Sequence, residues 1–383
     1  MELYVHIPFC KQKCRYCSFA SFPGQEAYFE KYAALILQEA RLRRAEAGES
    51  VTTVYFGGGT PSLLPPEIWT RLVSGLKTVY EIEPDAEFTS EANPGTVTRA
   101  WLDAAVSSGV NRLSFGVQAY QDRLMHLLGR IHLFNEAVSS VGLARETGIE
   151  NVSVDLIFGI PTQTMADWDE TIEASLSLRP MHLSAYGLIP EEGTPLFRDL
   201  EQGLLTLPDP DEEREMYGLV IRKADEAGLT QYEISNFARK GFECRHNIGY
   251  WTQVPYIGLG VSAASMTGAR SGTEGFTCVR TVNPDTLSGY EQFVSCGCVY
   301  GTAERISPAE SRFETMMLGL RMNRGISETD FVRMHGVSLD SCYGEKLRDM
   351  EKRGLLIHDH GIWKMTARGF DIQNSVLVEL MDG

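Results

Sequence analysis

The stretch "YVHIPFCKQKCRYC" (residues 4–17) joins a short apolar β pattern to three closely spaced cysteines. Cys10, Cys14 and Cys17 follow the spacing C-x3-C-x2-C. Thiolates hold zinc ions and iron–sulfur clusters, and a closed site of either kind normally has four protein ligands. Three thiolates leave one metal position open, which is typical of a working site. The pattern favours an iron–sulfur cluster, and a zinc site completed by His6 is the alternative.

The composition is that of an ordinary globular protein. The 383 residues suffice for one large α/β domain and a smaller one. The start of the chain has no basic leader or cleavage pattern, and no apolar run reaches the length of a membrane span, so we expect a cytoplasmic protein. A formal net charge of -16 argues against nucleic acid as a partner. In that compartment the five remaining cysteines are expected to have a structural or incidental role rather than to form disulfide bonds.

Short apolar runs alternate with amphipathic helical patterns in the first part of the chain. The runs predict strands at residues 2–7, 51–56, 86–92, 111–118, 151–158, 182–188 and 231–235. Repeated strand–helix units indicate a parallel sheet with right-handed crossovers. Six or seven units suggest a partial or full parallel (β/α) barrel, so we predict an α/β fold.

The pattern changes near residue 300. Helical patterns at 307–322, 327–336, 339–354 and 368–381 surround a hairpin turned at His360 and Gly361. This predicts a small α+β, winged-helix-like domain, and its balanced charges favour a packing or lid role over DNA binding. The predicted domains are a core barrel at 1–235, an extension at 236–300 and an accessory domain at 301–383.

Polar and glycine-rich motifs follow successive predicted strands. "GGGTP" (57–61) follows the second strand, Glu91 ends the third, Gln118 ends the fourth and Asp155 lies in the fifth. Functional residues of parallel barrels gather where strands end. These motifs are therefore expected to form one site with the cysteines, although a plain turn would also explain "GGGTP".

The cysteine spacing, with Tyr16 before the last cysteine, resembles the signature of radical S-adenosylmethionine (SAM) enzymes. In that family the open iron of a [4Fe-4S] cluster binds SAM, and reductive cleavage yields a 5′-deoxyadenosyl radical. The blocks "YVHIPFC", "YFGGGTPS", "EANPGT", "RLSFGVQ", "LLGRIH", "VDLIFGIPTQT" and "YEISNFAR" look like the coproporphyrinogen dehydrogenase (HemN) branch over about residues 1–300. The C-terminal segment resembles the accessory domain of that branch.

The resemblance implies a cofactor site. Tyr4 and Tyr16 would line the pocket. The methionyl part of SAM would meet Gly58, Gly59 and Thr60, where the missing Cβ permits close backbone approach. The ribose and the charged ends of SAM would bind Glu91, Gln118, Arg130 and Asp155, and Arg130 suits a carboxylate.

Two features separate the chain from the dehydrogenase. Phe19 stands where the dehydrogenase pattern has a fourth, catalytic cysteine, and only three residues precede Tyr4 where the dehydrogenase has a longer segment. "CRHNIGYW" (244–251) matches the H-N-x-x-Y-W motif of the related HemW group, thought to bind heme and deliver it to acceptor proteins. The implied heme contacts are His246, Asn247, Tyr250 and Trp251, with Cys244 as a competing thiolate. From the residues alone, loop capping and core filling are the alternative.

The sequence leaves three functions open. The first is a heme chaperone that binds heme, a [4Fe-4S] cluster and SAM and transfers heme to acceptors, with membrane-bound cytochromes as candidates. The second is an oxygen-independent coproporphyrinogen III oxidase, in which the radical abstracts hydrogen from a propionate and loss of carbon dioxide leaves a vinyl group. The third is another radical SAM reaction. Whether the scaffold is an enzyme, which residue ligates heme iron, and whether a cluster links a dimer are not determined by sequence.

Overall fold

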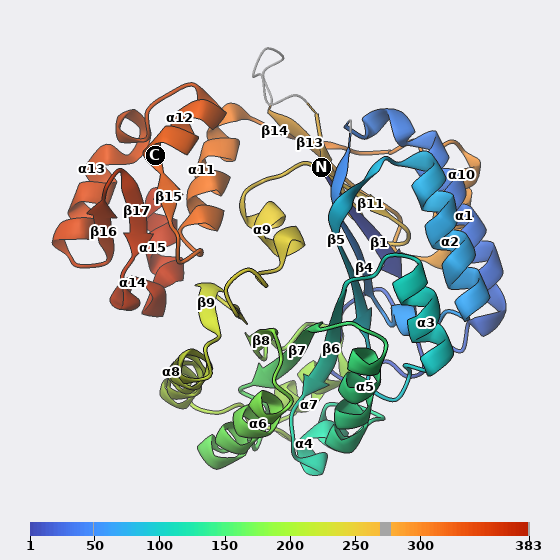
Figure 1. Cartoon of the computed structure of the whole chain (residues 1–383). Coiled ribbons are helices and arrows are strands. Elements are labelled where there is room, and N and C mark those ends of the chain that lie inside the picture. Colours follow the sequence, from blue (N-terminus) through green and yellow to red (C-terminus); the bar gives the residue numbers. More distant parts are fainter. Residues whose placement is uncertain (49, 269–276, 382–383) are drawn as a thin grey trace.

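A curved sheet of parallel strands forms the centre of the molecule (Figure 1). The computed structural model describes residues 1–48, 50–268 and 277–381, so residues 49, 269–276 and 382–383 of the predicted domains lie outside the described residues. Six of the parallel strands are β1 (Glu2–Ile7), β4 (Val51–Gly58), β5 (Ile82–Ala92), β6 (Arg112–Gln118), β7 (Asn151–Phe158) and β8 (His182–Gly187). The α/β fold predicted from the sequence is confirmed.

Helices cover the outer, convex face of this sheet (Figure 1). They are α1 (Phe29–Leu42), α2 (Pro66–Val79), α3 (Arg99–Ser107), α5 (Phe134–Glu146), α6 (Met165–Ser177) and α8 (Pro210–Glu226). The short helices α4 (Asp122–Leu127) and α7 (Pro195–Glu201) instead pack together with residues of the loops that follow the strands. Short elements complete the loops: β2 (Phe9–Cys10), β3 (Phe22–Pro23), and the 3-10 turns η1 (Glu26–Tyr28), η2 (Arg44–Glu46) and η3 (Pro61–Leu63). No helix in the described part of the chain combines the length and apolarity needed to cross a bilayer.

Further strands extend the sheet at both edges. Beside β1 the order continues with β11 (Tyr256–Leu259), β12 (Ala264–Thr267), β13 (Cys278–Val282) and β14 (Glu304–Ile306). Beside β8 it continues with β10 (Asn236–Ala238) and β9 (Thr230–Glu233). Within the described residues β14 and β9 do not pair with each other, so the barrel is partial rather than closed. Strands β10 to β14 were not predicted, because their runs are short.

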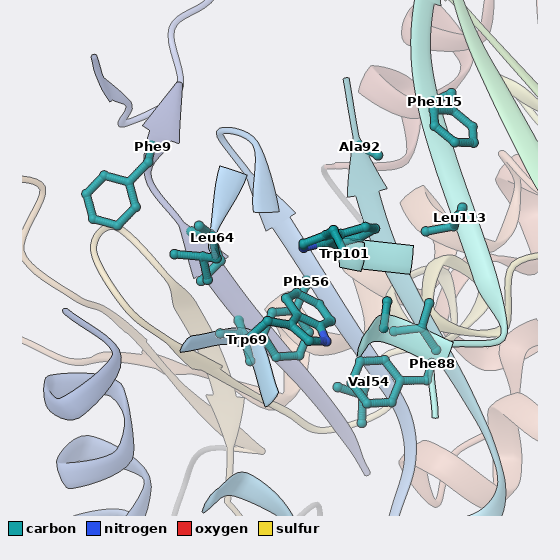
Figure 2. Packing of buried hydrophobic residues seen from close by; sticks show 14 of the residues in the cluster. Phe9, Val54, Phe56, Leu64, Trp69, Phe88, Ala92, Trp101, Leu113 and Phe115 are labelled. Carbon is teal, nitrogen blue, oxygen red and sulfur yellow. The ribbon is translucent and has the colours of Figure 1, made fainter. Parts of the chain in front are cut away.

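Alternation along each strand separates an apolar outer layer from a polar interior. On β6, Leu113, Phe115 and Val117 are buried in the core between the sheet and the helices. Figure 2 shows Leu113 and Phe115 in this layer, together with the indole rings of Trp69 and Trp101. Those two ring centroids lie 5.2 Å apart. The residues that alternate with the apolar ones face the concave side.

The C-terminal region has a core of its own. It comprises α11 (Pro308–Gly319), β15 (Ile326–Ser327), α12 (Glu328–His335), α13 (Leu339–Lys352), β16 (Leu356–Asp359), β17 (Ile362–Met365), α14 (Ala367–Asp371) and α15 (Gln373–Leu380), and it is preceded by α10 (Leu287–Ser295). His360 and Gly361 form the predicted hairpin turn with φ of 49° and 74°. The single last helix was wrong: it divides at Ile372, which leaves helical geometry at φ -121° and ψ 31°.

Candidate functional site

A cavity of about 470 Å³ lies inside the curve of the parallel sheet. Its walls come from the loops after the strands and from inward-facing strand residues. The predicted site residues on these walls are Cys10, Cys14, Tyr16, Cys17, Gly58, Gly59, Glu91, Gln118, Arg130, Asp155 and Asn247. The predicted residues that do not line this cavity are Tyr4, Thr60, His246, Tyr250 and Trp251.

The three cysteines of the opening motif share the cavity wall and are partly exposed. Arg130 places Nη1 3.4 Å from the Cys14 Sγ, and the Thr60 Oγ1 lies 3.6 Å from the Cys10 Sγ. Burial raises the pKa of Cys10, and the nearby Thr60 hydroxyl acts in the opposite direction. A cation and a hydroxyl beside the thiols suit ligands that must bind as thiolates.

The number of thiols on this wall matches the three ligands of a cluster that leaves one iron open. Among the described residues no three His, Cys, Asp or Glu side chains lie close enough to share one metal ion. In a four-iron cluster each thiolate binds a different iron, so its ligands lie farther apart than those of one zinc ion. Cys10, Cys14 and Cys17 supply three such thiolates from one loop, and their role as ligands of a [4Fe-4S] cluster stays a prediction.

His6, the ligand of the zinc alternative, is occupied elsewhere. Its Nδ1 lies 2.9 Å from the Tyr4 hydroxyl and its Nε2 lies 2.9 Å from the Ala20 carbonyl oxygen. Burial lowers the pKa of His6. Because Ala20 belongs to the segment that follows the cysteines, His6 ties the end of the cysteine loop to β1, and the structure gives the zinc alternative no support.

The glycines of "GGGTP" are packed against the protein's own backbone. A Cβ on Gly59 would lie 2.6 Å from the Phe9 carbonyl oxygen and 2.8 Å from the Ile7 carbonyl oxygen. Gly58 has φ +104°, and a Cβ there would overlap the His6 ring. Close packing against the cysteine loop thus explains these glycines without a ligand. Both also line the cavity, so their contact with SAM stays a prediction.

Arg130 is held in place by several acceptors. Its Nη2 donates to the Asn93 Oδ1 at 2.7 Å and to the Gly116 carbonyl oxygen at 2.6 Å. Asn93 in turn donates to the Thr60 Oγ1 at 2.7 Å. Thr60 thus positions Asn93, which in turn positions Arg130, although Thr60 itself does not line the cavity. The sequence reasoning did not name Asn93 as a site residue, although it lies within the quoted block "EANPGT".

Two partly buried carboxyl groups face the same cavity. Glu91 accepts from the Tyr55 hydroxyl at 2.9 Å and from the Gly58 N–H at 3.1 Å, and burial raises its pKa to about 7. Asp155 accepts from the hydroxyls of Ser114 at 2.8 Å and Ser184 at 2.7 Å, and burial raises its pKa as well. Sequence reasoning missed the serines, which the period-2 alternation of their strands could have indicated.

Gln118 and Tyr16 complete the predicted wall at the cysteine end. Gln118 ends β6 with φ 69°, at a shift in the β6–β7 register, and this turns its side chain toward the cavity. Tyr16 lies between the last two cysteines, and burial raises its pKa. Both positions are consistent with contact to a bound cofactor, and their roles stay predictions.

The H-N-x-x-Y-W motif forms α9 (Arg245–Trp251), a short helix on the concave side of the sheet (Figure 1). Glu87 accepts the backbone N–H groups of Arg245 at 2.9 Å and His246 at 3.1 Å. The Cys244 thiol also donates to Glu87 at 3.4 Å, and burial raises its pKa to about 12. The helix start is thereby anchored to β5, and Asn247 reaches into the cavity.

His246 is engaged on both ring nitrogens. Its Nδ1 lies 2.7 Å from the Thr53 Oγ1 and its Nε2 lies 3.0 Å from the Tyr250 hydroxyl. The residue is 1% exposed, and burial lowers its pKa to about 3. The Trp251 side chain lies near Glu233 and acts against the burial that raises the pKa of that carboxyl group. Binding of His246 to heme iron would require one of these bonds to break, and that role stays a prediction.

Two protein families and a solved structure match this chain. The Radical SAM superfamily matches residues 4–174, and the HemN C-terminal domain matches residues 306–372. The solved structure of coproporphyrinogen III oxidase (HemN) from Escherichia coli has a TM-score of 0.84 at 24% identity and covers 100% of this chain and 89% of that one. At this identity the likeness shows the fold.

Sequence relatives span nearly the whole chain. The heme chaperone HemW of Bacillus subtilis is 36% identical over 97% of this chain and 97% of its own length. HemW of Escherichia coli is 32% identical over 98% and 97%. The mitochondrial radical S-adenosyl methionine domain-containing protein 1 of Bos taurus is 33% identical over 99% and 87%. The chain therefore belongs to the HemW family of heme chaperones within the radical SAM superfamily.

Proposed function

We propose that this protein is a heme chaperone that binds heme, a [4Fe-4S] cluster and SAM and passes heme to acceptor proteins. The observation that carries the proposal is one cavity lined both by the three cysteines and by Asn247 of the H-N-x-x-Y-W motif, in a member of the HemW family. The cluster, SAM and the heme to be transferred would then bind at neighbouring places in one cavity.

The residues at the cysteine end have separate tasks in this proposal. Cys10, Cys14 and Cys17 hold the cluster, which when bound supplies an open iron for SAM and an electron for its reduction. Arg130, fixed by Asn93 and Gly116, faces the carboxylate of SAM. The acceptors Glu91, Gln118 and Asp155 bind the hydroxyls of its ribose.

An apolar rim borders the same cavity and suits the flat face of heme. Phe19 is 65% exposed and Ile189 is 71% exposed, and both line the cavity together with Tyr186. Large exposed apolar side chains around a cavity mark a binding surface. Phe19 also occupies the place of the fourth cysteine in the oxidase pattern, so this position lacks the thiol that the oxidase pattern has there.

The finer parts of the proposal concern partners and location. We include membrane-bound cytochromes as heme acceptors, a cluster-linked dimer, and a cytoplasmic location. The domain limits 1–235, 236–300 and 301–383 remain part of this proposal. Co-purification with apo-cytochromes in membranes, sedimentation with and without the cluster, and limited proteolysis test these parts in turn.

An anaerobic comparison tests the function itself. The cluster is reconstituted, and the holoprotein receives either heme or coproporphyrinogen III, each with SAM and a reductant. We expect stoichiometric heme binding, transfer of that heme to an apo-acceptor, and no protoporphyrinogen. Turnover of coproporphyrinogen III would refute the chaperone and establish the oxidase.

A further inference from the structure

Arg112, the first residue of β6, faces the interior of the barrel. Its neighbour Leu113 is buried in the outer core, so alternation turns Arg112 to the concave side. Arg112 is 2% exposed and lines the cavity together with Asn247. A guanidinium keeps its charge at any physiological pH, so a full positive charge is buried at this place.

This guanidinium has no hydrogen bond and no ion pair to any other described residue. Its Nε is buried without a partner. Arg43, which is 1% exposed, provides the contrast: it donates to Glu39, Glu46, the Gly258 carbonyl oxygen and Ser265. A buried, unpaired charge is costly, whereas a ligand carboxylate would satisfy it.

The acidic groups around Arg112 already serve other donors. Glu87 accepts the N–H groups at the start of α9. Glu91 accepts from Tyr55 and Gly58, and Asp155 from serine hydroxyls. These acids lie close enough to interact electrostatically with Arg112, but no hydrogen bond or ion pair joins any of them to it among the described residues. A ligand carboxylate could therefore act as the direct acceptor.

The position of Arg112 separates it from the cysteine end. Gln118 ends the same strand at the cysteine end, and six residues of parallel strand span roughly 20 Å. Arg130 already stands beside Cys14 for the carboxylate of SAM. A second arginine at the start of β6, near Asn247, therefore suits the carboxylate of a different ligand.

We propose that Arg112 binds a propionate carboxylate of the heme cargo at the α9 end of the cavity. This inference rests on the proposed chaperone function and deepens it. A guanidinium matches a carboxylate with two parallel hydrogen bonds, and heme is the proposed ligand that carries propionates.

Heme titrations of the holoprotein test this assignment. We compare wild type, Arg112→Met and the control Arg71→Met, which removes an exposed ion pair with Glu30. We expect Arg112→Met to weaken heme binding about tenfold or more, as loss of a charged hydrogen bond does, and Arg71→Met to have no effect. Heme dimethyl ester, which has no carboxylate, should bind wild type and Arg112→Met equally.

Folding and cofactor controls keep the test decisive. Ligand-free Arg112→Met should melt at or above the wild-type temperature, because methionine replaces an unpaired buried charge. Arg112→Lys should fold and lose part of the heme affinity, since an ammonium lacks the two-pronged geometry. Unchanged heme affinity in Arg112→Met overturns the inference, as does an equal loss for the dimethyl ester or a loss of SAM affinity alone. Failure of wild type to bind heme would instead refute the chaperone function.

Discussion

Gly59→Ala is expected to separate two explanations of the glycine motif. In the structure the place of a Cβ on Gly59 lies 2.6 Å from the Phe9 carbonyl oxygen, 2.8 Å from the Ile7 carbonyl oxygen and 2.8 Å from the Phe9 nitrogen. All three are backbone atoms, which cannot rotate away as a side chain can. An alanine must therefore displace the segment that leads directly into Cys10.

The size of the effect follows from these contacts. Overpacking by a methyl group typically lowers the unfolding free energy by about 1–3 kcal/mol. Because the neighbours of Gly59 are backbone atoms that cannot move aside, we expect a loss of about 3 kcal/mol for Gly59→Ala. The displacement also shifts Cys10 relative to Cys14 and Cys17. We expect a lower denaturation midpoint together with reduced iron content after anaerobic reconstitution.

Gly142→Ala is the matched control. Gly142 lies within α5, and a Cβ there would meet no atom within 4 Å. Alanine is the better helix former, so this variant should gain up to about 1 kcal/mol and take up wild-type iron. Denaturant unfolding and iron analysis are measured on both variants and on wild type.

If Gly59→Ala unfolds at the wild-type midpoint and binds wild-type iron, the packing argument is refuted. A variant that keeps stability and iron but loses SAM affinity would show that the glycine serves close approach of the cofactor instead. The two explanations therefore predict different measurements from one substitution.

Three further outcomes are expected. Cys14→Ala should abolish the visible absorbance and the iron of the reconstituted protein, whereas Cys296→Ala, at an exposed position, should retain both, and iron retained in Cys14→Ala would contradict the cluster assignment. Burial raises the pKa of Glu2 from 4.5 to about 8, so the folded protein holds a proton that the unfolded chain has released. The stability that this proton contributes is full below pH 4.5 and is lost as pH rises through about 8. In wild type, the free energy of unfolding measured in urea should therefore fall by at most about 3 kcal/mol between about pH 5.5 and 7.5, and Glu2→Gln should remove this fall. If the variant shows the same pH dependence as wild type, the expectation is contradicted. His246→Ala should lose heme binding if the imidazole ligates iron, whereas unchanged heme affinity with a lower melting temperature would show that His246 only anchors α9 through Thr53 and Tyr250.

Much of the barrel could be predicted because its strands carry strong local signals. The run at 151–158 matches β7 at both ends, since it is apolar and bounded by turns. The short strands β10 and β11 have no such signal. β11 pairs in parallel with β1, which lies about 250 residues earlier, so its place depends on tertiary pairing rather than on local sequence.

Part of the site could also be predicted, because local sequence signals mark the ends of the strands. Cysteines and strand-end motifs lie where parallel strands end, and the structure brings eleven of the sixteen named residues to one cavity. His246 is different: its residue type suits a metal ligand, but its partners Thr53 and Tyr250 occupy both nitrogens. Spacing shows which residues are available, whereas the hydrogen-bond partners show which are already used.

Arg43 and Arg112 show this difference between side chains that have partners in the described part of the chain and side chains that do not. Both are buried arginines in a negatively charged protein. Arg43 has Glu39 and Glu46 one helical turn away on either side, whereas Arg112 stands in a strand with no acidic neighbour in sequence. Arg43 is surrounded by its own acceptors and holds α1 against β11 and β12 through Gly258 and Ser265. Arg112 has the same donors and no acceptor among the described residues. The two arginines are equally buried, but within the described residues only Arg43 has acceptors for its donors. We therefore assign Arg43 a structural role and Arg112 a ligand-binding role, and this places the anion-binding end of the cavity beside α9.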